Sequence, residues 1–322
     1  MKKYINILSK FFILILGIII YVYNKKNNEK IYQSYVAIYC VSSGFISYFL
    51  SKIISLFSNN YKSSDLLINN ITQNIDNNGY SVLDERYEKI KVNNLYNLVN
   101  EIKCFSRNDL SESKKLFKDH DVKFPTYSYS EVDLISQKCV LDIITDNKFL
   151  DIAQNYLKCT PVLTSVNMWW STDYLKKPHS EAAQMFHFDL DRIKWLKFFI
   201  YLTDVNEDNG PHVYIEKTHK AFSKPYKFML KGYQRIDDKE IYDSYGNDRI
   251  KKIIGKAGTV IIGNTSCYHK GIPPKNGNRL IFEFELSNSM FGAPDSNKLS
   301  TLDHNEIFQN YKNNNPSLFL KY

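Results

Sequence analysis

The second half of the chain changes its hydrophobic period from that of helices to that of strands. After Pro161, short runs rich in β-branched and aromatic residues follow one another, each bounded by Gly, Pro, Asn or Asp. Runs of this kind are typical of strands. They are PVLTSVNMWWS, FHFDL, WLKFFIYLTDV, PHVYIE, GTVIIGN and RLIFEFELS. At least six strands after a set of helices predict an α+β fold, a β-sandwich or barrel with helices on one face.

Helical patterns come before these strands. From about Ser63 the chain has the composition of an ordinary globular domain. Apolar residues recur at helical spacing between Tyr87 and Phe105, and two more helical patterns lie between Glu131 and Lys158. Residues after Ser289 lack a clear pattern, and a helix followed by a tail is expected there. The chain contains no visible internal repeat.

The first sixty residues differ in kind from the rest. An apolar run covers Phe11–Tyr23, and a second stretch, Ile31–Leu50, contains no charge. About twenty helical residues span the hydrocarbon core of a bilayer. A two-helix membrane hairpin over residues 1–60 is therefore favoured. A cleaved signal peptide stays open, although no small-residue cleavage site follows the first run. One spanning helix followed by an interfacial helix also stays open.

Charge and cysteine usage limit the partners and the compartment. The formal net charge is +8, from 42 basic and 34 acidic residues, and no block of Lys and Arg stands out, so no nucleic acid partner is expected. The five cysteines form no CxxC pair, which favours free thiols in a reducing compartment. Lysines at the outer ends of the two apolar runs outnumber those in the turn between them. This bias predicts a membrane-anchored protein whose main domain is cytoplasmic.

An imidazole and a carboxylate stand two positions apart in the segment QMFHFDL. In a strand, side chains two residues apart project from the same face, so His187 and Asp189 would converge while Phe186 and Phe188 point the other way. One histidine and one carboxylate are two of the three ligands of a facial triad, which binds Fe(II). The pair alone does not establish a metal site, because a hydrogen-bonded histidine next to a turn aspartate gives the same pattern.

A third ligand and a cation follow about eighty residues later. His269 comes after an apolar strand bounded by glycines, and Arg279 opens the next strand ten positions on. A guanidinium group can bind a carboxylate through two parallel hydrogen bonds. Cys267 is a poorer candidate ligand, because a thiolate suits other metals better than an oxygen-activating Fe(II) centre. His187, Asp189, His269 and Arg279 together predict an iron site beside a binding site for an organic acid.

Residues from Ser63 to about Met290 resemble the phytanoyl-CoA dioxygenase family of Fe(II)- and 2-oxoglutarate-dependent oxygenases. The resemblance is carried by NNGYSVL, FLDIAQNYLKCTPVLTSVNMWWS, QMFHFD, IYLTDVNEDNGPHVYIEKTH and DRIKKIIGKAGTVIIGNTSCYHKG. It implies a double-stranded β-helix of the jelly-roll or cupin type. It also implies Fe(II) held by His187, Asp189 and His269, with 2-oxoglutarate bound by the iron and by Arg279. The implied reaction uses O2 to hydroxylate a small-molecule or lipid-like substrate and releases succinate and CO2.

Two positions depart from the family pattern, and two side chains have open roles. Glu216–His219, EKTH, stands where the family usually has Pro-Gly-Ser-His, and Gly263-Asn264 stands where it commonly has Gly-Asp. These changes affect loop shape rather than metal ligands. Asn167 is a candidate contact to 2-oxoglutarate, since related enzymes place a polar side chain there, or a strand-end residue bonding the backbone. Lys197 lies among apolar neighbours and is expected to face solvent or to pair with an acid.

The last predicted strand has a polar face that needs an explanation. On strict alternation Arg279 shares its face with Glu283 and Glu285. Either the inner wall of the barrel is polar there, which makes Glu283 a cavity residue, or a bulge breaks the register. Gln184, just before the HxD pair, either holds a ligand or substrate or has a structural role.

The expected organisation is a membrane anchor at residues 1–60, an oxygenase domain at 61–290 and a C-terminal tail at 291–322. Two other functions stay open. A catalytically inactive, membrane-tethered binding module would keep the barrel without the chemistry. A cupin-type metalloenzyme would bind metal without using 2-oxoglutarate. Fold analogy does not choose the substrate, although a membrane location makes a lipid or a glycan precursor attractive.

Overall fold

The structure is a computed structural model of the chain. It describes residues 29–58, 61–106, 113–175, 177–180, 182–293 and 300–322. The first predicted membrane helix, around Phe11–Tyr23, lies outside the described residues. Within the described ranges, every pair of neighbouring strands is antiparallel.

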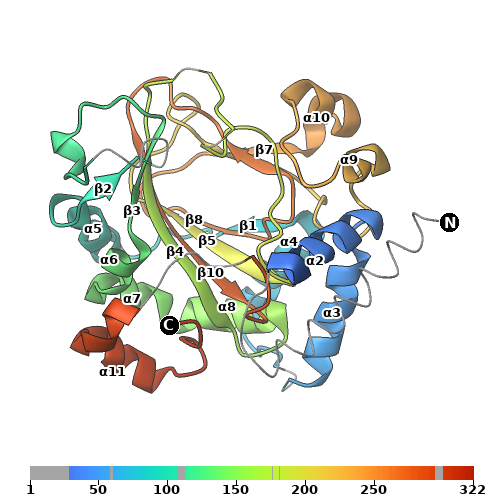
Figure 1. Cartoon of the computed structure of the whole chain (residues 1–322), viewed down its shortest axis with the longest axis horizontal. Coiled ribbons are helices and arrows are strands. Elements are labelled where there is room, and N and C mark those ends of the chain that lie inside the picture. Colours follow the sequence, from blue (N-terminus) through green and yellow to red (C-terminus); the bar gives the residue numbers. More distant parts are fainter. Residues whose placement is uncertain (1–28, 59–60, 107–112, 176, 181, 294–299) are drawn as a thin grey trace.

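Two antiparallel sheets form the centre of the molecule (Figure 1). The larger sheet contains β1 (Tyr80–Val82), β2 (Cys104–Phe105), β3 (Thr126–Tyr129), β4 (Val162–Ser171), β5 (Trp195–Tyr201), β8 (Val260–Gly263) and β10 (Arg279–Ser287). The smaller sheet contains β6 (His212–Ile215), β7 (Ile250–Ile253) and β9 (His269–Gly271). Their strand orders are β1-β8-β5-β10-β4-β3-β2 and β7-β6-β9. The predicted strand runs are thereby confirmed, except FHFDL, which forms isolated bridges only.

Helices cover the outer face of the larger sheet (Figure 1). They are α4 (Leu66–Asn78), α5 (Lys89–Asn97), α6 (Glu131–Ile135), α7 (Lys138–Ile144), α8 (Asn147–Leu157) and α11 (Glu306–Asn314). Two more, α9 (Tyr226–Leu230) and α10 (Asp238–Tyr245), lie between β6 and β7 in the sequence, and short 3₁₀ turns cover Leu98–Asn100, Phe117–Asp119, Asn247–Arg249 and Ser300–His304. Phe149 of α8 packs on Phe198 and Phe284, with ring centroids 5.3 and 5.6 Å away. The C-terminal segment joins this core through Phe308 and Phe319, which are fully buried.

The turn after α4 shows why a glycine is needed next to the site. Asp65 caps the start of α4 by accepting a 2.7 Å hydrogen bond from the Leu67 amide. Gly79 ends the helix with φ 95°, in the left-handed region that favours glycine. A Cβ atom at this position would lie 2.1 Å from the Cys267 sulfur. Gly79 therefore allows the start of β1 to lie close to Cys267, in the loop that leads into β9.

The charge-free stretch Ile31–Leu50 forms two helices instead of the single helix that a membrane hairpin requires. They are α2 (Glu29–Val41) and α3 (Phe45–Leu56). The chain turns between them because Ser43 and Gly44 take positive φ angles of 49° and 84°. Taken over the described residues, no one helix has the length and apolar character to cross a bilayer. The α2–α3 pair, bent by 115°, meets that test by length and composition only.

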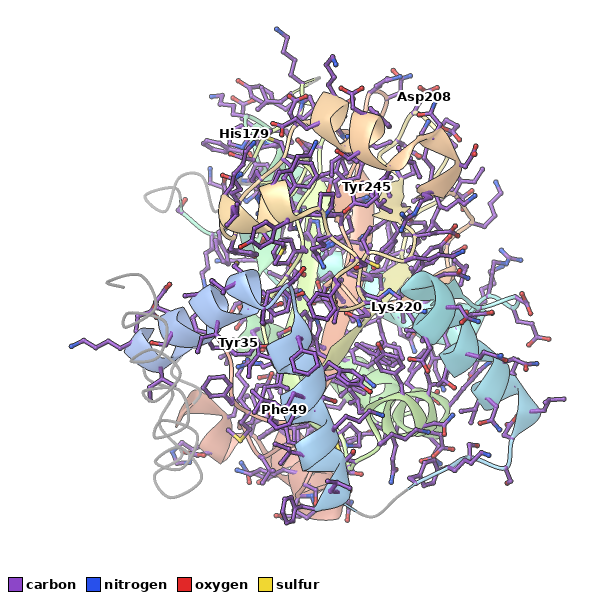
Figure 2. The ribbon with its side chains drawn as sticks, turned by 90° about the vertical axis from the view of Figure 1, so that its right-hand side faces the viewer. Tyr35, Phe49, His179, Asp208, Lys220 and Tyr245 are labelled. Atoms are coloured by element: carbon purple, nitrogen blue, oxygen red, sulfur yellow. The ribbon has the colours of Figure 1, made fainter. Side chains whose placement is uncertain are left out.

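The first of these helices is packed into the domain. Figure 2 shows α2 and α3 in blue across one face of the molecule, with Tyr35 on α2 and Phe49 on α3. Tyr35 is fully buried, and its hydroxyl donates to the Arg192 carbonyl oxygen at 3.3 Å. The Tyr39 ring stacks on Phe188 with centroids 5.8 Å apart. α2 therefore contributes to the same apolar cluster as the residue between His187 and Asp189.

Replacing Tyr39 by alanine should lower the free energy of unfolding by about 3 kcal/mol, as expected for truncation of a buried aromatic ring. The ring is only 3% exposed, so its removal leaves a cavity against Phe188. Tyr48→Ala on α3 is the matched control, because Tyr48 is 56% exposed and its loss should have little effect. Urea denaturation of the two variants measures the difference. Equal stabilities would show that α2 is not part of the folded core.

The EKTH turn adopts the backbone that a glycine would favour. Lys217 stands where the family usually has glycine, and its φ is 65°. Its amide donates to the Asn78 carbonyl oxygen at 2.9 Å. The neighbouring Thr218 hydroxyl donates to the Ile215 carbonyl oxygen at 2.8 Å and accepts from the Tyr268 amide at 2.9 Å. The changed sequence therefore keeps a tight turn that is bonded to the residue before His269.

Lys217→Gly should raise the free energy of unfolding by about 1 kcal/mol, because it removes the strain of a non-glycine residue in the left-handed region. Lys217 is exposed, so no packing is lost. Thermal or urea denaturation checks the sign. The same substitution at the exposed Lys231, where no positive φ occurs, should leave stability unchanged or reduce it.

Candidate functional site

Reciprocal backbone hydrogen bonds bring the HxD segment beside the start of β9. The His187 amide donates to the His269 carbonyl oxygen at 3.1 Å, and the His269 amide donates to the His187 carbonyl oxygen at 2.8 Å. The Asp189 amide donates to the Thr265 carbonyl oxygen at 2.8 Å. These bonds give the segment a strand-like alternation, although it forms no named strand. His187 and Asp189 therefore project from one face, as the spacing predicts.

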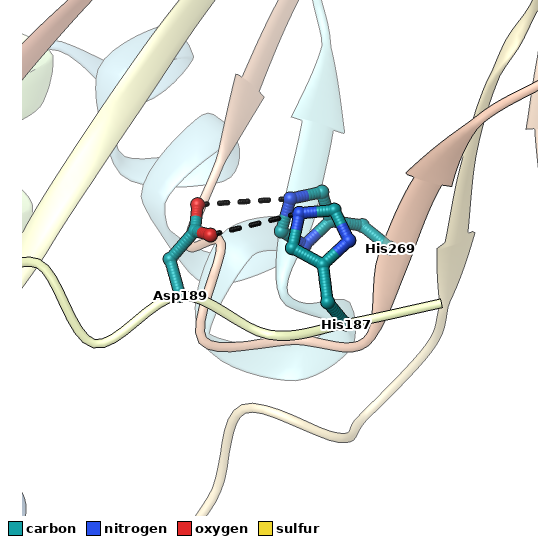
Figure 3. Close-up of side chains that lie close together, drawn as sticks. All are labelled: His187, Asp189 and His269. Atoms are coloured by element: carbon teal, nitrogen blue, oxygen red, sulfur yellow. Dashed lines mark ion pairs between the residues drawn. The ribbon is translucent and has the colours of Figure 1, made fainter. Parts of the chain in front are cut away.

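The three predicted ligands form one compact cluster (Figure 3). The Asp189 carboxylate oxygens lie 3.7 Å from His187 Nε2 and 3.6 Å from His269 Nε2. The candidate ligand atoms all lie within 4.8 Å of one another, and the three side chains are buried. Metal–ligand bonds of about 2.1 Å place adjacent ligand atoms about 3 Å apart. The three side chains would therefore need to move together only slightly to bind one metal ion. The cluster has the composition of a 2-His-1-carboxylate triad.

Backbone carbonyls fix the orientation of both imidazoles. His187 Nδ1 lies 2.9 Å from the Met185 carbonyl oxygen, and His269 Nδ1 lies 2.9 Å from the Cys267 carbonyl oxygen. A carbonyl only accepts, so each Nδ1 carries the proton. Each Nε2 then presents its lone pair toward Asp189. Metal-binding histidines are commonly held by a second bond of this kind.

The protonation states of the cluster suit a divalent cation. Burial lowers the pKa of both imidazoles, and mutual repulsion with His269 lowers that of His187 further. Burial alone would raise the pKa of Asp189, but Lys197 and the two imidazoles outweigh it and lower that pKa. Two neutral imidazoles and one carboxylate are therefore the stable forms at neutral pH. This is the donor set that Fe(II) accepts in oxygenases.

Aromatic residues next to the ligands form the back wall of the cluster. Phe188 lies between the first two ligands, and Tyr268 directly precedes the third. Their rings meet edge to face at 5.5 Å. The Lys224 ammonium lies 4.8 Å from the Phe188 ring and donates to the Thr218 carbonyl oxygen at 2.6 Å. Strand alternation thus places polar ligands on one side and a packed apolar layer on the other.

Lys197 of β5 pairs with acids, which confirms one of the two expectations for it. Its ammonium lies 2.9 Å from Asp189 and 2.8 Å from Asp191, and its side chain is 13% exposed. Burial would lower the pKa of Lys197, but the carboxylates of Asp189 and Asp191 raise it well above its ordinary value. The lysine therefore remains charged and holds one oxygen of the metal-ligating carboxylate.

One cavity of about 300 Å³ lies between the two sheets, and all five predicted site residues line it. They are His187, Asp189, His269, Arg279 and Asn167. β10 pairs regularly with β4 from Arg279 to Glu285 and with β5 from Ile281 to Ser287, and the register with β4 shifts only between Glu285 and Leu286. The polar face of β10 therefore points inward, and Glu283 also lines the cavity. The bulge does not account for the polar face.

Arg279 is buried at one end of this cavity. Its guanidinium donates to the Ser171 hydroxyl at 2.9 Å and to the Gly210 carbonyl oxygen. Its Nε atom is buried and has no hydrogen-bond partner among the described residues. A buried donor without a partner is costly unless a ligand completes it. The guanidinium is therefore placed to receive an anionic ligand.

His212 of β6 is a cavity residue that the sequence analysis did not identify. Its ring lies parallel to that of His269, with centroids 5.7 Å apart, and stacks on Tyr214 at 5.0 Å. Within the described part of the chain, its Nε2 is buried and lacks a partner. Burial and the nearby His269 and Arg279 lower the pKa of His212 well below its ordinary value. His212 stands at the start of a short strand, and no sequence pattern around it distinguishes it from an ordinary strand residue.

Two further residues with open roles now have neighbours. The Asn167 amide donates to the Glu283 carboxylate at 3.4 Å, and a contact from Asn167 to 2-oxoglutarate stays a prediction. Gln184 is 2% exposed and accepts a 3.0 Å hydrogen bond from the His179 amide. This bond closes the loop before the HxD segment, which favours the structural interpretation. Asn264, where the family commonly has aspartate, donates to the Tyr156 hydroxyl at 2.8 Å.

Solved structures share this fold at low sequence identity. HygX from Streptomyces hygroscopicus with nickel and 2-oxoglutarate bound has a TM-score of 0.51 and 15% identity, over 69% of this chain and 88% of that chain. HygX with nickel, 2-oxoglutarate and hygromycin B has a TM-score of 0.50 and 12% identity over the same shares. EctD from S. alaskensis with 2-oxoglutarate and 5-hydroxyectoine has a TM-score of 0.50 and 16% identity, over 71% and 79%.

Sequence comparison gives the family directly. No curated protein matches the chain. The profile of the phytanoyl-CoA dioxygenase family matches residues 75–279, which is more than half of the chain and includes the His-Asp-His cluster and Arg279. The metal cluster has the ligands for iron. The two HygX structures contain nickel together with 2-oxoglutarate, and the EctD structure contains 2-oxoglutarate. This chain belongs to the phytanoyl-CoA dioxygenase family of iron- and 2-oxoglutarate-dependent enzymes.

Proposed function

We propose that the protein is an Fe(II)- and 2-oxoglutarate-dependent oxygenase that hydroxylates a small-molecule substrate and releases succinate and CO2. The observation that carries the proposal is the gathering of His187, Asp189, His269 and Arg279 around one cavity. Iron bound by the triad would supply O2 activation coupled to decarboxylation of 2-oxoglutarate. The Asp189 carboxylate would occupy a position on the metal that a halide would otherwise need, which favours hydroxylation over halogenation.

The side chains of this chain would bind and orient the reactants. His187 and His269 present their Nε2 lone pairs because backbone carbonyls hold each Nδ1 proton. Lys197 donates to one Asp189 oxygen and thereby fixes the orientation of the carboxylate that would help to hold the metal. Arg279 would bind the distal carboxylate of 2-oxoglutarate, and His212 is placed to donate or accept beside it. The enclosing sheets exclude bulk water from these contacts.

Three measurements on the purified chain test this proposal. Fe(II) titration under argon should show one tight site, 2-oxoglutarate should bind only with metal present, and aerobic turnover should yield succinate. A chain that binds no metal would be the inactive binding module. A chain that binds metal but not 2-oxoglutarate would be the cupin-type metalloenzyme. Membrane attachment of residues 1–60 stays a prediction, because α2 within this range packs into the folded domain, and fractionation of the full-length chain tests it separately.

Arg279→Ala should weaken 2-oxoglutarate binding by about 100-fold, since hydrogen bonds to a charged group are each worth about 1.5–3 kcal/mol. Iron affinity should not change, because Arg279 touches none of the three ligands. Arg279→Lys should recover only part of the loss, since an ammonium lacks the planar fork. The exposed Arg86→Ala is the control. An unchanged dissociation constant for 2-oxoglutarate in Arg279→Ala would remove Arg279 from the site.

A further inference from the structure

Glu283 is a carboxylate in the active-site cavity that the proposed chemistry does not use. It lies on the inward face of β10, four residues beyond Arg279, and is 6% exposed. On one side it is paired with Asn167 of β4, and on the other with Phe199 of β5. A strand rises about 3.3 Å per residue, so about 13 Å of β10 separates Glu283 from Arg279. The cavity thus has an anion-binding end and an acidic end.

The Glu283 carboxylate has few polar partners. Among the described residues, its carboxylate accepts one long hydrogen bond, from Asn167 at 3.4 Å, and forms no ion pair. Glu285, on the same face of β10, accepts from the Thr164 hydroxyl at 2.6 Å and lies 3.5 Å from the Arg192 guanidinium, so it is held by protein groups and does not line the cavity. Lys197 is engaged by Asp189 and Asp191. Burial raises the pKa of Glu283, and the Lys197 ammonium opposes this effect only in part. A buried carboxylate with so little compensation is costly unless a ligand provides the missing partner.

The surroundings of Glu283 indicate which partner fits. Phe199 and Trp169, the latter on the same face of β4 as Asn167, line the cavity with it. Aromatic rings beside a carboxylate form the combination that attracts an ammonium group. Arg235 also lines the cavity but is exposed to solvent at its edge, where its charge is screened. The inner wall therefore favours a cation over an anion at this end.

We propose that Glu283 is a substrate-binding residue, and that the substrate carries a protonated amine which Glu283 binds between Trp169 and Phe199. This inference rests on the proposed function, because it takes the same cavity as the active site. It narrows the substrate to small, basic compounds. Glu283 binds one end of the substrate, so the carbon to be oxidised is held toward the metal ligands rather than toward Arg279.

Paired ligands test the inference directly. Calorimetry on the full-length chain loaded with Fe(II) and 2-oxoglutarate under argon compares cyclohexylamine with cyclohexanol and benzylamine with benzyl alcohol. Each amine should bind about 10- to 100-fold tighter than its alcohol, which is the worth of one charged hydrogen bond. Glu283→Gln should abolish the preference while iron and 2-oxoglutarate affinities stay unchanged. Ser128→Ala, in the same cavity, should keep the preference.

The outcomes separate this inference from the proposed function. If the wild-type chain binds iron and 2-oxoglutarate but no amine binds more tightly than its alcohol, the amine site is refuted and the oxygenase assignment stands. A preference that persists in Glu283→Gln also refutes it. If the wild-type chain binds no 2-oxoglutarate, the proposed function itself fails. The wild-type comparison needs no variant, so it holds even if Glu283→Gln does not fold.

Discussion

Replacing Asp189 by alanine should abolish conversion of 2-oxoglutarate to succinate, both with substrate and in uncoupled turnover. The substitution removes one of three metal ligands and leaves two neutral imidazoles, so the charge that offsets the cation is lost. It also leaves the Lys197 ammonium pointing at the cation site, where it would repel the metal. Iron titration and succinate analysis measure the two effects separately.

Matched controls decide whether the loss is specific. His187→Ala and His269→Ala should give the same result as Asp189→Ala, whereas His304→Ala, at an exposed position outside the cavity, should behave like the wild type. Circular dichroism establishes that each variant is folded. Normal succinate formation in Asp189→Ala would rule out the assignment of the metal site.

Lys197→Met should destabilise the metal-free protein by about 3–5 kcal/mol, because it leaves the buried carboxylate of Asp189 without its cation. It should also weaken metal binding by about 10- to 100-fold, as expected when the group that orients a metal ligand is lost. Because its metal affinity is lower, Lys197→Met should gain about 1.4–2.7 kcal/mol less stability than the wild type from the same saturating metal concentration.

Lys194→Met, directly before β5, provides the comparison. The Lys194 ammonium donates to the Tyr156 carbonyl oxygen at 2.6 Å and has no carboxylate partner among the described residues. Burial lowers the pKa of Lys194 to about 8, so its loss removes an unfavourable buried charge. Denaturation with and without Zn(II) should then show a metal-dependent difference for Lys197→Met alone. Identical metal responses in both variants would exclude a positioning role for Lys197.

The ligands could be predicted because each depends on local spacing. His187 and Asp189 alternate with Phe188, and this alternation survives although the segment is joined only by isolated bridges. The polar face of β10 followed from the same period of two, and the regular register placed Glu283 in the cavity. The alternation of side chains along a strand and the positions of charged residues were therefore enough to predict most of the site residues.

The contacts that the sequence could not give are those between distant segments. A stretch without charge, such as the one that begins at Ile31, suits a bilayer and a protein core equally well. For α2 only the packing against Phe188 and Phe291 decides between them. His212 lies in the cavity because β6 pairs with β9, and no local sequence pattern predicts this pairing. Lys197 lies near Asp191 only because β5 folds back beside the HxD segment.

The packing of α2 changes where the chain can be cut. The family match begins at residue 75, so a shortened protein designed on that boundary would omit Tyr35 and Tyr39. Phe188 would then meet water directly behind the metal cluster. Loss of activity in such a fragment would reflect the loss of α2 packing behind the metal cluster rather than the loss of a membrane anchor. A gene fragment that starts upstream of Glu29 keeps this packing, and should be the one used for crystallisation and metal reconstitution.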